Sequence, residues 1–163
     1  MILRLLIAFC SVFSACGFQL RGQASLPFET IYISSPVGHP IGTDLKRLIK
    51  AGTNTRVVDK AKGAQTTLEI ISVVNDKQIM SVSGGGRVRE FELRYRVSFR
   101  LFDAKGVDLI PTNVIALRRI LPYTDAQVVA KEGEEAMLVK EMQNDSAQQI
   151  LRRLEAVKIA ATK

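Results

Sequence analysis

The sequence has no tryptophan, a single histidine, His39, and only two cysteines, Cys10 and Cys16. One histidine with no nucleophile or orienting group assigned to it gives no catalytic constellation. A transition-metal site would need several histidine or cysteine ligands. The glycine run Gly84, Gly85 and Gly86 lacks the Gly-Lys-Ser/Thr that completes a phosphate-binding loop. We therefore predict a protein that is not an enzyme and that holds no metal and no cofactor.

The N-terminal end has the parts of a bacterial lipoprotein signal. Arg4 is the only charged residue before Cys16, residues 5–13 are apolar, and the small residues Ser14 and Ala15 precede the cysteine. The apolar run is too short to cross a bilayer, which takes roughly 20 residues. We predict that a signal peptide is removed before Cys16; the alternative is an ordinary secretory leader cut near Ala15.

The predicted cleavage divides the chain into a signal peptide at 1–15, a lipidated N-terminus and tether at 16–25, and a single domain at 26–163. Cys16 would carry a diacylglycerol and an N-acyl chain, which contribute about 0.8 kcal/mol per buried CH₂. Gly17 rather than Asp follows the cysteine, so we expect the periplasmic face of the outer membrane of a Gram-negative cell. The net charge of +7 favours anionic lipids or acidic protein surfaces as binding partners. At this location we expect no nucleic-acid partner.

Alternating apolar residues predict four strands, at 28–34, 65–82, 87–102 and 107–121. The third is the clearest, because its odd positions are apolar and its even positions are mostly charged. Pro111, early in the fourth, indicates an edge strand or a bulge. In the second, we expect Leu68, Ile70 and Val74 to share one side.

Two helices complete the pattern. A short helix is predicted at about 43–51, with Thr43 as its cap. A longer one follows the capping-box sequence at 124–127 and continues to about Glu155, with Gly133 as a place where it could bend. The resulting order, β-α-β-β-β-α, predicts the α+β class: a four-stranded, mainly antiparallel sheet with two helices packed on one face.

Arginine is the most informative residue of the surface. Seven arginines fall in or beside the last two predicted strands: Arg87, Arg89, Arg94, Arg96, Arg100, Arg118 and Arg119. Guanidinium groups bind phosphate and carboxylate in bidentate fashion. The alternative is a solvated strand face on which Glu90 and Glu92 are cross-strand partners. The glycine run would form the flexible tip of the hairpin between the arginine-rich strand and the strand before it.

The N-terminal segment Cys16-Gly17-Phe18-Gln19-Leu20-Arg21-Gly22 resembles the start of the LptE family of outer-membrane lipopolysaccharide-assembly lipoproteins. The element order and the late helix, with Met137–Met142 and Ala147–Leu154, are similar too. The resemblance covers nearly all of the chain after residue 15. It implies a protein that plugs the lumen of the LptD β-barrel, assists assembly of that barrel, and takes part in inserting lipopolysaccharide into the outer leaflet.

The resemblance also implies site residues. The family has a basic residue early in the last helix that is implicated in lipopolysaccharide binding, and Lys131 matches it. A second lies near the hairpin tip, where this chain has glycines, with Arg87 and Arg89 next to them. Lys131 comes two residues after the apolar Val129, which predicts that it points outward. The residues predicted to face the barrel are Arg94, Arg96, Arg100, Arg118, Arg119, Gly84, Gly85 and Gly86.

A freestanding lipoprotein that binds or shuttles lipid is the alternative to the plug. It would need an apolar groove large enough for acyl chains. The predicted elements offer one apolar face per strand and two helices to cover them, which leaves no evident cavity. An envelope hydrolase is a weaker alternative, because no catalytic constellation is visible in the sequence.

We expect the Cys16→Ala variant to lose its membrane location without unfolding, because the predicted anchor lies outside the folded domain. Membrane fractionation checks the location, and circular dichroism of the purified variant checks the fold. A Cys16→Ala protein that still fractionates with the outer membrane would contradict the predicted lipidation.

Overall fold

The computed structural model describes residues 25–123 and 128–157. The predicted signal peptide, nearly all of the tether and the capping-box sequence at 124–127 lie outside these ranges. The elements in chain order are β1 (Thr30–Ser34), α2 (Ile41–Gly52), β2 (Arg56–Val58), β3 (Thr66–Val82), β4 (Val88–Asp103), β5 (Asp108–Pro122) and α3 (Val128–Glu155). The four predicted strands and both predicted helices are present, and the α+β class is confirmed.

The sheet has five strands in the order β2-β1-β3-β4-β5 and is mixed. β1 pairs in parallel with both β2 and β3, whereas β3, β4 and β5 pair antiparallel. The predicted four-stranded, mainly antiparallel sheet was therefore wrong in strand number and in the pairing of β1. β2 has only three residues, too few to show an alternation, and α2 provides the crossover that brings it back parallel to β1.

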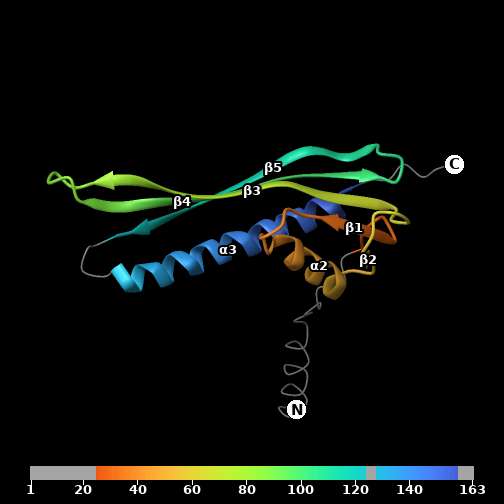
Figure 1. Ribbon diagram of the computed structural model, residues 1–163, viewed down its shortest axis with the longest axis horizontal. Helices are drawn as coiled ribbons and strands as arrows, with labels where there is room; N and C mark the ends of the chain where they lie inside the picture. Colours follow the sequence, from red (N-terminus) through yellow and green to blue (C-terminus); the bar gives the residue numbers. More distant parts are fainter. Residues whose placement is uncertain (1–24, 124–127, 158–163) are drawn as a thin grey trace, which may run out of the picture.

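The three long antiparallel strands extend far beyond the rest of the sheet. β1 pairs with β3 only at Thr66–Glu69, so β1, β2 and α2 form a compact end (Figure 1). The remainder of β3, β4 and β5, called the ribbon here, continues to the β3–β4 turn. β3 has 17 residues, a length of roughly 55 Å. α3, with 28 residues and a length of roughly 40 Å, runs along the ribbon.

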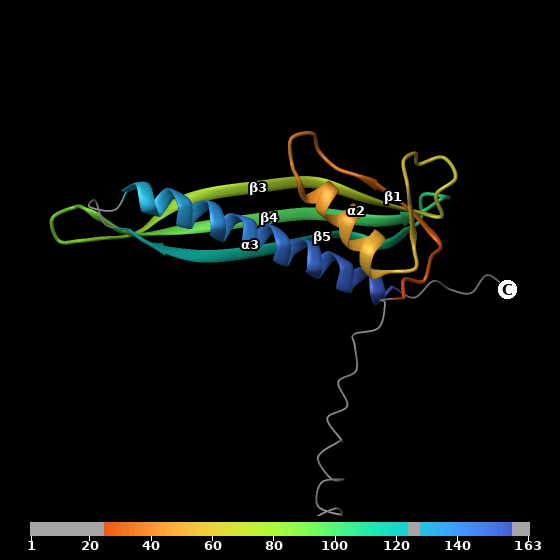
Figure 2. The same cartoon turned by 90° about the horizontal axis from the view of Figure 1, so that it is seen from below.

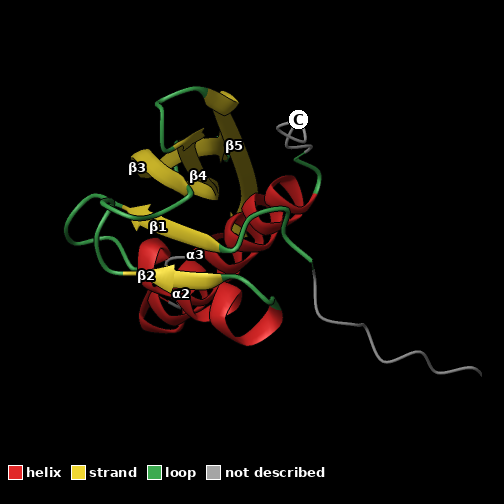
Figure 3. Ribbon diagram, turned by 90° about the vertical axis from the view of Figure 1, so that its right-hand side faces the viewer, coloured by secondary structure: helices red, strands yellow, loops and turns green. Residues whose placement is uncertain are grey.

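Both helices lie on the same face of the sheet, as predicted (Figures 2 and 3). On β4 the odd residues from Leu93 to Leu101 are buried, while the even residues stay at least partly exposed. α3 buries Met142, Ala147, Ile150 and Leu154 against this surface. The largest fully buried side chains are Phe99, Ile31, Ile41, Leu45, Ile49, Leu68, Leu93, Leu101, Ile115, Leu121, Met142 and Ile150.

Bulges interrupt the regular alternation of inward and outward side chains in β3 and β5. A register shift between Ile70 and Ser72 inserts one residue, so that Val73 packs on the core while Val74 is exposed. The prediction that Val74 shares a side with Leu68 and Ile70 was wrong for this reason. β5 is an edge strand, and its register shifts around Pro111, which confirms the prediction of an edge or a bulge.

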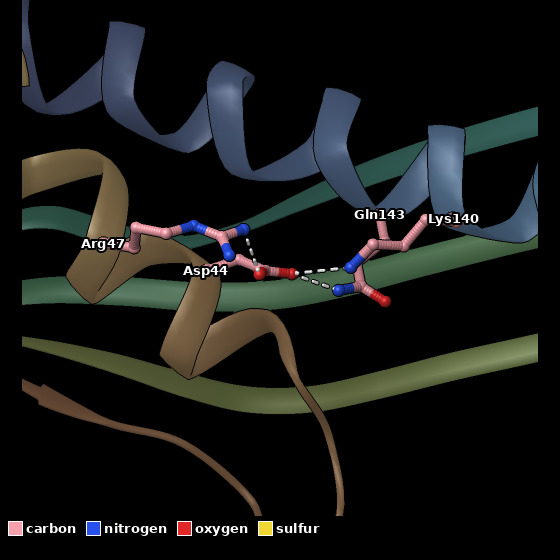
Figure 4. A network of polar contacts seen from close by, with 4 residues as sticks. All are labelled: Asp44, Arg47, Lys140 and Gln143. Atoms are coloured by element: carbon pink, nitrogen blue, oxygen red, sulfur yellow. Dashed lines mark hydrogen bonds and ion pairs between the residues drawn. The ribbon is translucent and has the colours of Figure 1, made fainter. Parts of the chain in front are cut away.

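A buried carboxylate joins the two helices (Figure 4). Asp44, in the first turn of α2, accepts hydrogen bonds at Oδ2 from Gln143 Nε2 and from Lys140 Nζ at 3.3 Å, both on α3. Its Oδ1 accepts from Arg47 Nη2 at 2.8 Å. Burial, with a contribution from the Asp44 charge, raises the pKa of Tyr95 to about 12, so this phenol stays neutral at physiological pH.

The helix start differs from the prediction. α2 begins at Ile41, preceded by Pro40 without a side-chain cap, so the expected cap at Thr43 was wrong. Asp44 falls in the first turn, where a carboxylate is favourable toward the helix dipole. Its partners on α3 depend on the packing of the two helices, which the sequence pattern does not show.

Asp44→Ala should lower the free energy of unfolding by about 1–3 kcal/mol, because Gln143 and Lys140 lose a buried charged acceptor. Urea denaturation at neutral pH measures the change. Arg47→Ala is the matched control. Its side chain is 70% exposed, and we expect a loss below about 1 kcal/mol. Equal losses for the two variants would show that the carboxylate does not join α2 to α3.

Candidate functional site

The face of the ribbon that points away from α2 and α3 is called the outer face. On β4 it consists of Glu90, Glu92, Arg94, Arg96, Ser98 and Arg100, the even positions that remain at least partly exposed. The strand registers add Asp76, Val74 and Glu69 from β3, and Arg118, Ala116 and Val114 from β5. No other element of the described chain covers this face, because both helices lie on the opposite side of the sheet (Figure 1).

Three outer-face arginines are paired with carboxylates across the strands. Arg94 binds Asp76 with both Nε and Nη2, the Nε contact being 2.9 Å. Arg100 Nε lies 2.6 Å from Glu69 Oε2, and Arg118 Nη1 lies 3.7 Å from Glu92 Oε1. The alternative that we considered, with Glu90 and Glu92 as cross-strand partners, holds for Glu92, whereas the partners of Arg94 and Arg100 are Asp76 and Glu69 of β3. Glu90 instead accepts a hydrogen bond from Ser81.

Arg119 lies on the opposite, helix-covered face. Its Nη2 lies 3.1 Å from Asp145 Oδ2 of α3, and its Nη1 donates to the Arg118 carbonyl. Successive residues of a strand point to opposite faces. The two adjacent arginines that we predicted to share a role thus do not share a surface.

The β3–β4 turn forms the far tip of the ribbon (Figure 1). The amide of Gly86 donates to the Ser83 carbonyl at 2.9 Å, and Gly86 has a φ of +76°, a conformation that favours glycine. Gly84, Gly85, Gly86, Arg87 and Arg89 are all exposed. Beside the turn, Ile79, Met80 and Val82 also expose much of their apolar surface. The tip therefore combines exposed guanidinium groups with apolar side chains.

A hollow of about 560 Å³ lies next to the tip. It is lined by Ser81, Val82, Arg89, Glu90, Pro122 and Tyr123. Arg89 therefore borders a concave surface, whereas Arg87 does not line it. The carboxylate of Glu90, which also lines this hollow, would repel an anion bound deep inside it. An anion bound by Arg89 would be attracted by the guanidinium group.

Lys131 is less exposed than the sequence predicted. Its side chain is only 16% exposed, and its Nζ lies 2.6 Å from Glu134 Oε2, one turn further along α3. The prediction that it points outward into solvent was therefore wrong, because an acidic residue at i+3 holds it against the helix. The start of α3 and the hairpin tip lie toward the same end of the molecule (Figure 1).

Lys77 is a cation that the sequence analysis did not single out. Its Nζ lies 2.6 Å from Glu135 Oε2 of α3 and 4.2 Å from the centroid of the Phe91 ring. Phe91 in turn packs edge-on against Tyr123, with ring centroids 5.1 Å apart. This group fastens the first half of α3 to the ribbon. The only feature of the sequence that could have indicated this contact is the apolar Phe91, which lies between charged residues of the strand.

An open groove of about 490 Å³ runs between β3 and α3. Five of its seven lining residues carry polar or charged groups, and two of these are carboxylates: Asn75, Glu132, Glu135, Ala136, Val139, Lys140 and Gln143. Such a groove does not suit the acyl chains that a lipid shuttle would carry. In the described ranges, no three histidine, cysteine or acidic side chains gather to hold a metal ion. No helix there is long and apolar enough to cross a membrane.

Comparison with known proteins gives a consistent result. A family model described as LptE, lipopolysaccharide-assembly, matches residues 28–154. The LPS-assembly lipoprotein LptE of Yersinia pestis (strain Pestoides F) is 30% identical over 169 residues, covering 99% of this chain and 79% of that protein.

Solved structures share the fold. Lipoprotein B from Nitrosomonas europaea has a TM-score of 0.76 at 50% identity, covering 86% of this chain and 91% of that one. Rare lipoprotein B from Shewanella oneidensis has a TM-score of 0.68 at 24% identity, covering 78% and 94%. The second likeness concerns the fold alone. Because the family match extends over all seven described elements, the chain belongs to the LptE family of lipopolysaccharide-assembly lipoproteins, which are not enzymes.

Proposed function

We propose that this lipoprotein plugs the lumen of an LptD-type outer-membrane β-barrel, assists its assembly, and takes part in inserting lipopolysaccharide into the outer leaflet. The observation that carries the proposal is the outer face: three long strands whose charged surface is covered by nothing else in the described chain (Figure 1). Family membership places the protein in lipopolysaccharide assembly. The barrel partner and the contacts with lipopolysaccharide belong to the proposal.

A polar lumen suits this surface. The interior wall of a large membrane barrel presents polar side chains, and it has no free strand edge to extend the sheet. A plug inside it must therefore meet the wall through side chains. The outer face offers side chains of both charge signs along β4, with the apolar Val74 and Val114 exposed on the flanking strands. This mixture resembles a protein interface more than a surface for acyl chains.

The anchor completes the proposed placement. Acyl chains on Cys16 would hold the protein at the periplasmic side of the outer membrane, with residues 16–25 as the tether. The described chain starts a few residues before β1, at the compact end. The ribbon and its tip would then point away from the anchor, into the lumen.

For lipopolysaccharide we propose Arg87, Arg89 and Lys131 as the binding residues. Lipid A carries phosphates, which guanidinium and ammonium groups bind through charge-assisted hydrogen bonds. Arg87 and Arg89 are exposed beside apolar tip residues, which matches a ligand with both phosphates and acyl chains. Lys131 would have to exchange Glu134 for a phosphate, so we expect it to contribute less than the arginines.

The first test is an affinity capture of C-terminally tagged protein from detergent-solubilised outer membranes, with mass spectrometry of the bound material. We expect a near-stoichiometric large β-barrel that remains bound at high salt, because a plug is enclosed on many sides. Recovery of the lipoprotein alone, or with lipid only, would reject the plug in favour of a freestanding lipid-binding protein.

The Arg87→Asp/Lys131→Asp double variant should bind purified lipopolysaccharide at least about tenfold more weakly, the equivalent of one charge-assisted hydrogen bond of 1.5–3 kcal/mol. Capture of lipopolysaccharide on the immobilised protein measures this, and circular dichroism checks the fold. Lys105→Asp, an exposed change in the β4–β5 turn, is the matched control. Wild-type binding by the double variant would remove both residues from the site, and an equal loss in the control would indicate nonspecific attraction.

A further inference from the structure

Arg96 differs from the other arginines of the outer face. Within the described residues it has no ion pair, whereas Arg94, Arg100 and Arg118 each contact a carboxylate. We infer that Arg96 binds a carboxylate of the protein that covers the outer face, and that this contact is the charged anchor point of that interface. The inference rests on the proposed function, because it takes the covering protein to be the barrel.

The position of Arg96 is central and its immediate surroundings are neutral. Across the strands its partners in the register are Val74 on β3 and Ala116 on β5. Along β4 it is followed on the same face by Ser98 and preceded by Arg94, whose guanidinium is committed to Asp76. A cation among small and apolar neighbours is the arrangement of an interface hot spot, where surrounding contacts exclude water.

The nearby acids each have a partner in this chain. Asp76, diagonal to Arg96 across the β3–β4 pair, accepts both donors of Arg94 on Oδ2, while its Oδ1 is buried and has no hydrogen bond among the described residues. Glu92 pairs with Arg118, and Glu69 with Arg100. The outer face therefore neutralises three of its four arginines within this chain. The fourth, Arg96, is exposed and has no ion pair among the described residues.

Covering the face makes a counter-charge necessary. Transferring an unpaired guanidinium from water into an interface is strongly unfavourable, and an opposite charge with hydrogen bonds offsets the cost. Arginine matches a carboxylate with two parallel N–H···O bonds. A wall that buries Val74 and Ala116 must bury Arg96 with them, since the three lie in one row across the strands. The covering protein must therefore bring an acceptor to this row.

A protein carboxylate fits better than a lipid phosphate. Phosphate binding would favour several unpaired cations together, yet the neighbouring arginines are neutralised and four carboxylates, Glu69, Asp76, Glu90 and Glu92, lie on the same face. Arg96 lines neither the groove along α3 nor the hollow at the tip. A single carboxylate on a polar lumen wall can bind one unpaired guanidinium group, and it needs no cavity around that group.

The test uses the native complex captured from outer membranes. We expect Arg96→Glu to reduce the recovered barrel at least tenfold, because it places two carboxylates together, and Arg96→Gln to reduce it less. Arg56→Glu is the matched control: Arg56 is an exposed arginine on β2, at the far side of the sheet, with no ion pair among the described residues. Melting temperature and circular dichroism of each isolated variant confirm the fold.

A second variant gives a positive signal. Lysine couples to a contacting carboxylate through a water-soluble carbodiimide, whereas arginine does not. Arg96→Lys should form an amide with an aspartate or glutamate of the barrel, located by peptide mass spectrometry, and Arg56→Lys should not.

The outcomes separate the two proposals. If the wild type captures no barrel, the proposed function fails before Arg96 is tested. If the wild type captures it and Arg96→Glu does so equally well, the inference about Arg96 fails and the plug stands. An amide that joins residue 96 only to Asp76 of the same chain would also overturn the inference, because it would show that the guanidinium is satisfied internally.

Discussion

β4 places apolar and charged side chains on opposite faces over 16 residues, and this segregation determines how much of the sheet the chain can cover. The odd side chains need a hydrophobic cover, which α3 and α2 provide. The even side chains could be covered from within the chain only at the cost of burying several charges. Both helices therefore lie on one face, and the other remains open for a different molecule. The strand registers extend this division to β3 and β5.

Features that rest on local pattern were predictable from the sequence. The faces of β4, the edge position marked by Pro111 and the two helices depend on spacing within one segment. β2 was not predictable, because three residues show no period and its place beside β1 depends on how α2 returns the chain. The bulge at Ile71 was missed as well. It has no sequence signature here, yet one inserted residue reverses the faces of the residues that follow it, as far as the next register shift after Ile79.

The candidate site, like the fold, was predictable from the sequence only where it depends on local pattern. Alternation alone places Arg94, Arg96 and Arg100 on one face, and it also places Arg118 and Arg119 on opposite faces. Which arginine meets which carboxylate depends on register between distant segments, 18 residues apart for Arg94 and Asp76 and 31 for Arg100 and Glu69. The distinct status of Arg96 therefore emerges only from the structure. The contact between Lys131 and Glu134 is local, and the i+3 spacing could have indicated it.

Two different kinds of polar contact hold α3 to the rest of the domain. At the compact end, the carboxylate of Asp44 is only 7% exposed and binds α3 in a buried setting, where breaking a hydrogen bond is costly. Along the ribbon, Lys77 and Glu135 are each about one-third exposed, and such pairs contribute little. β3 also has β4 as its only strand neighbour there. Local stability should therefore fall from the compact end toward the tip. The proposed tether would precede the compact end, so the anchored half would be the more stable one, and the tip that carries Arg87 and Arg89 would be the half that adjusts to what it binds.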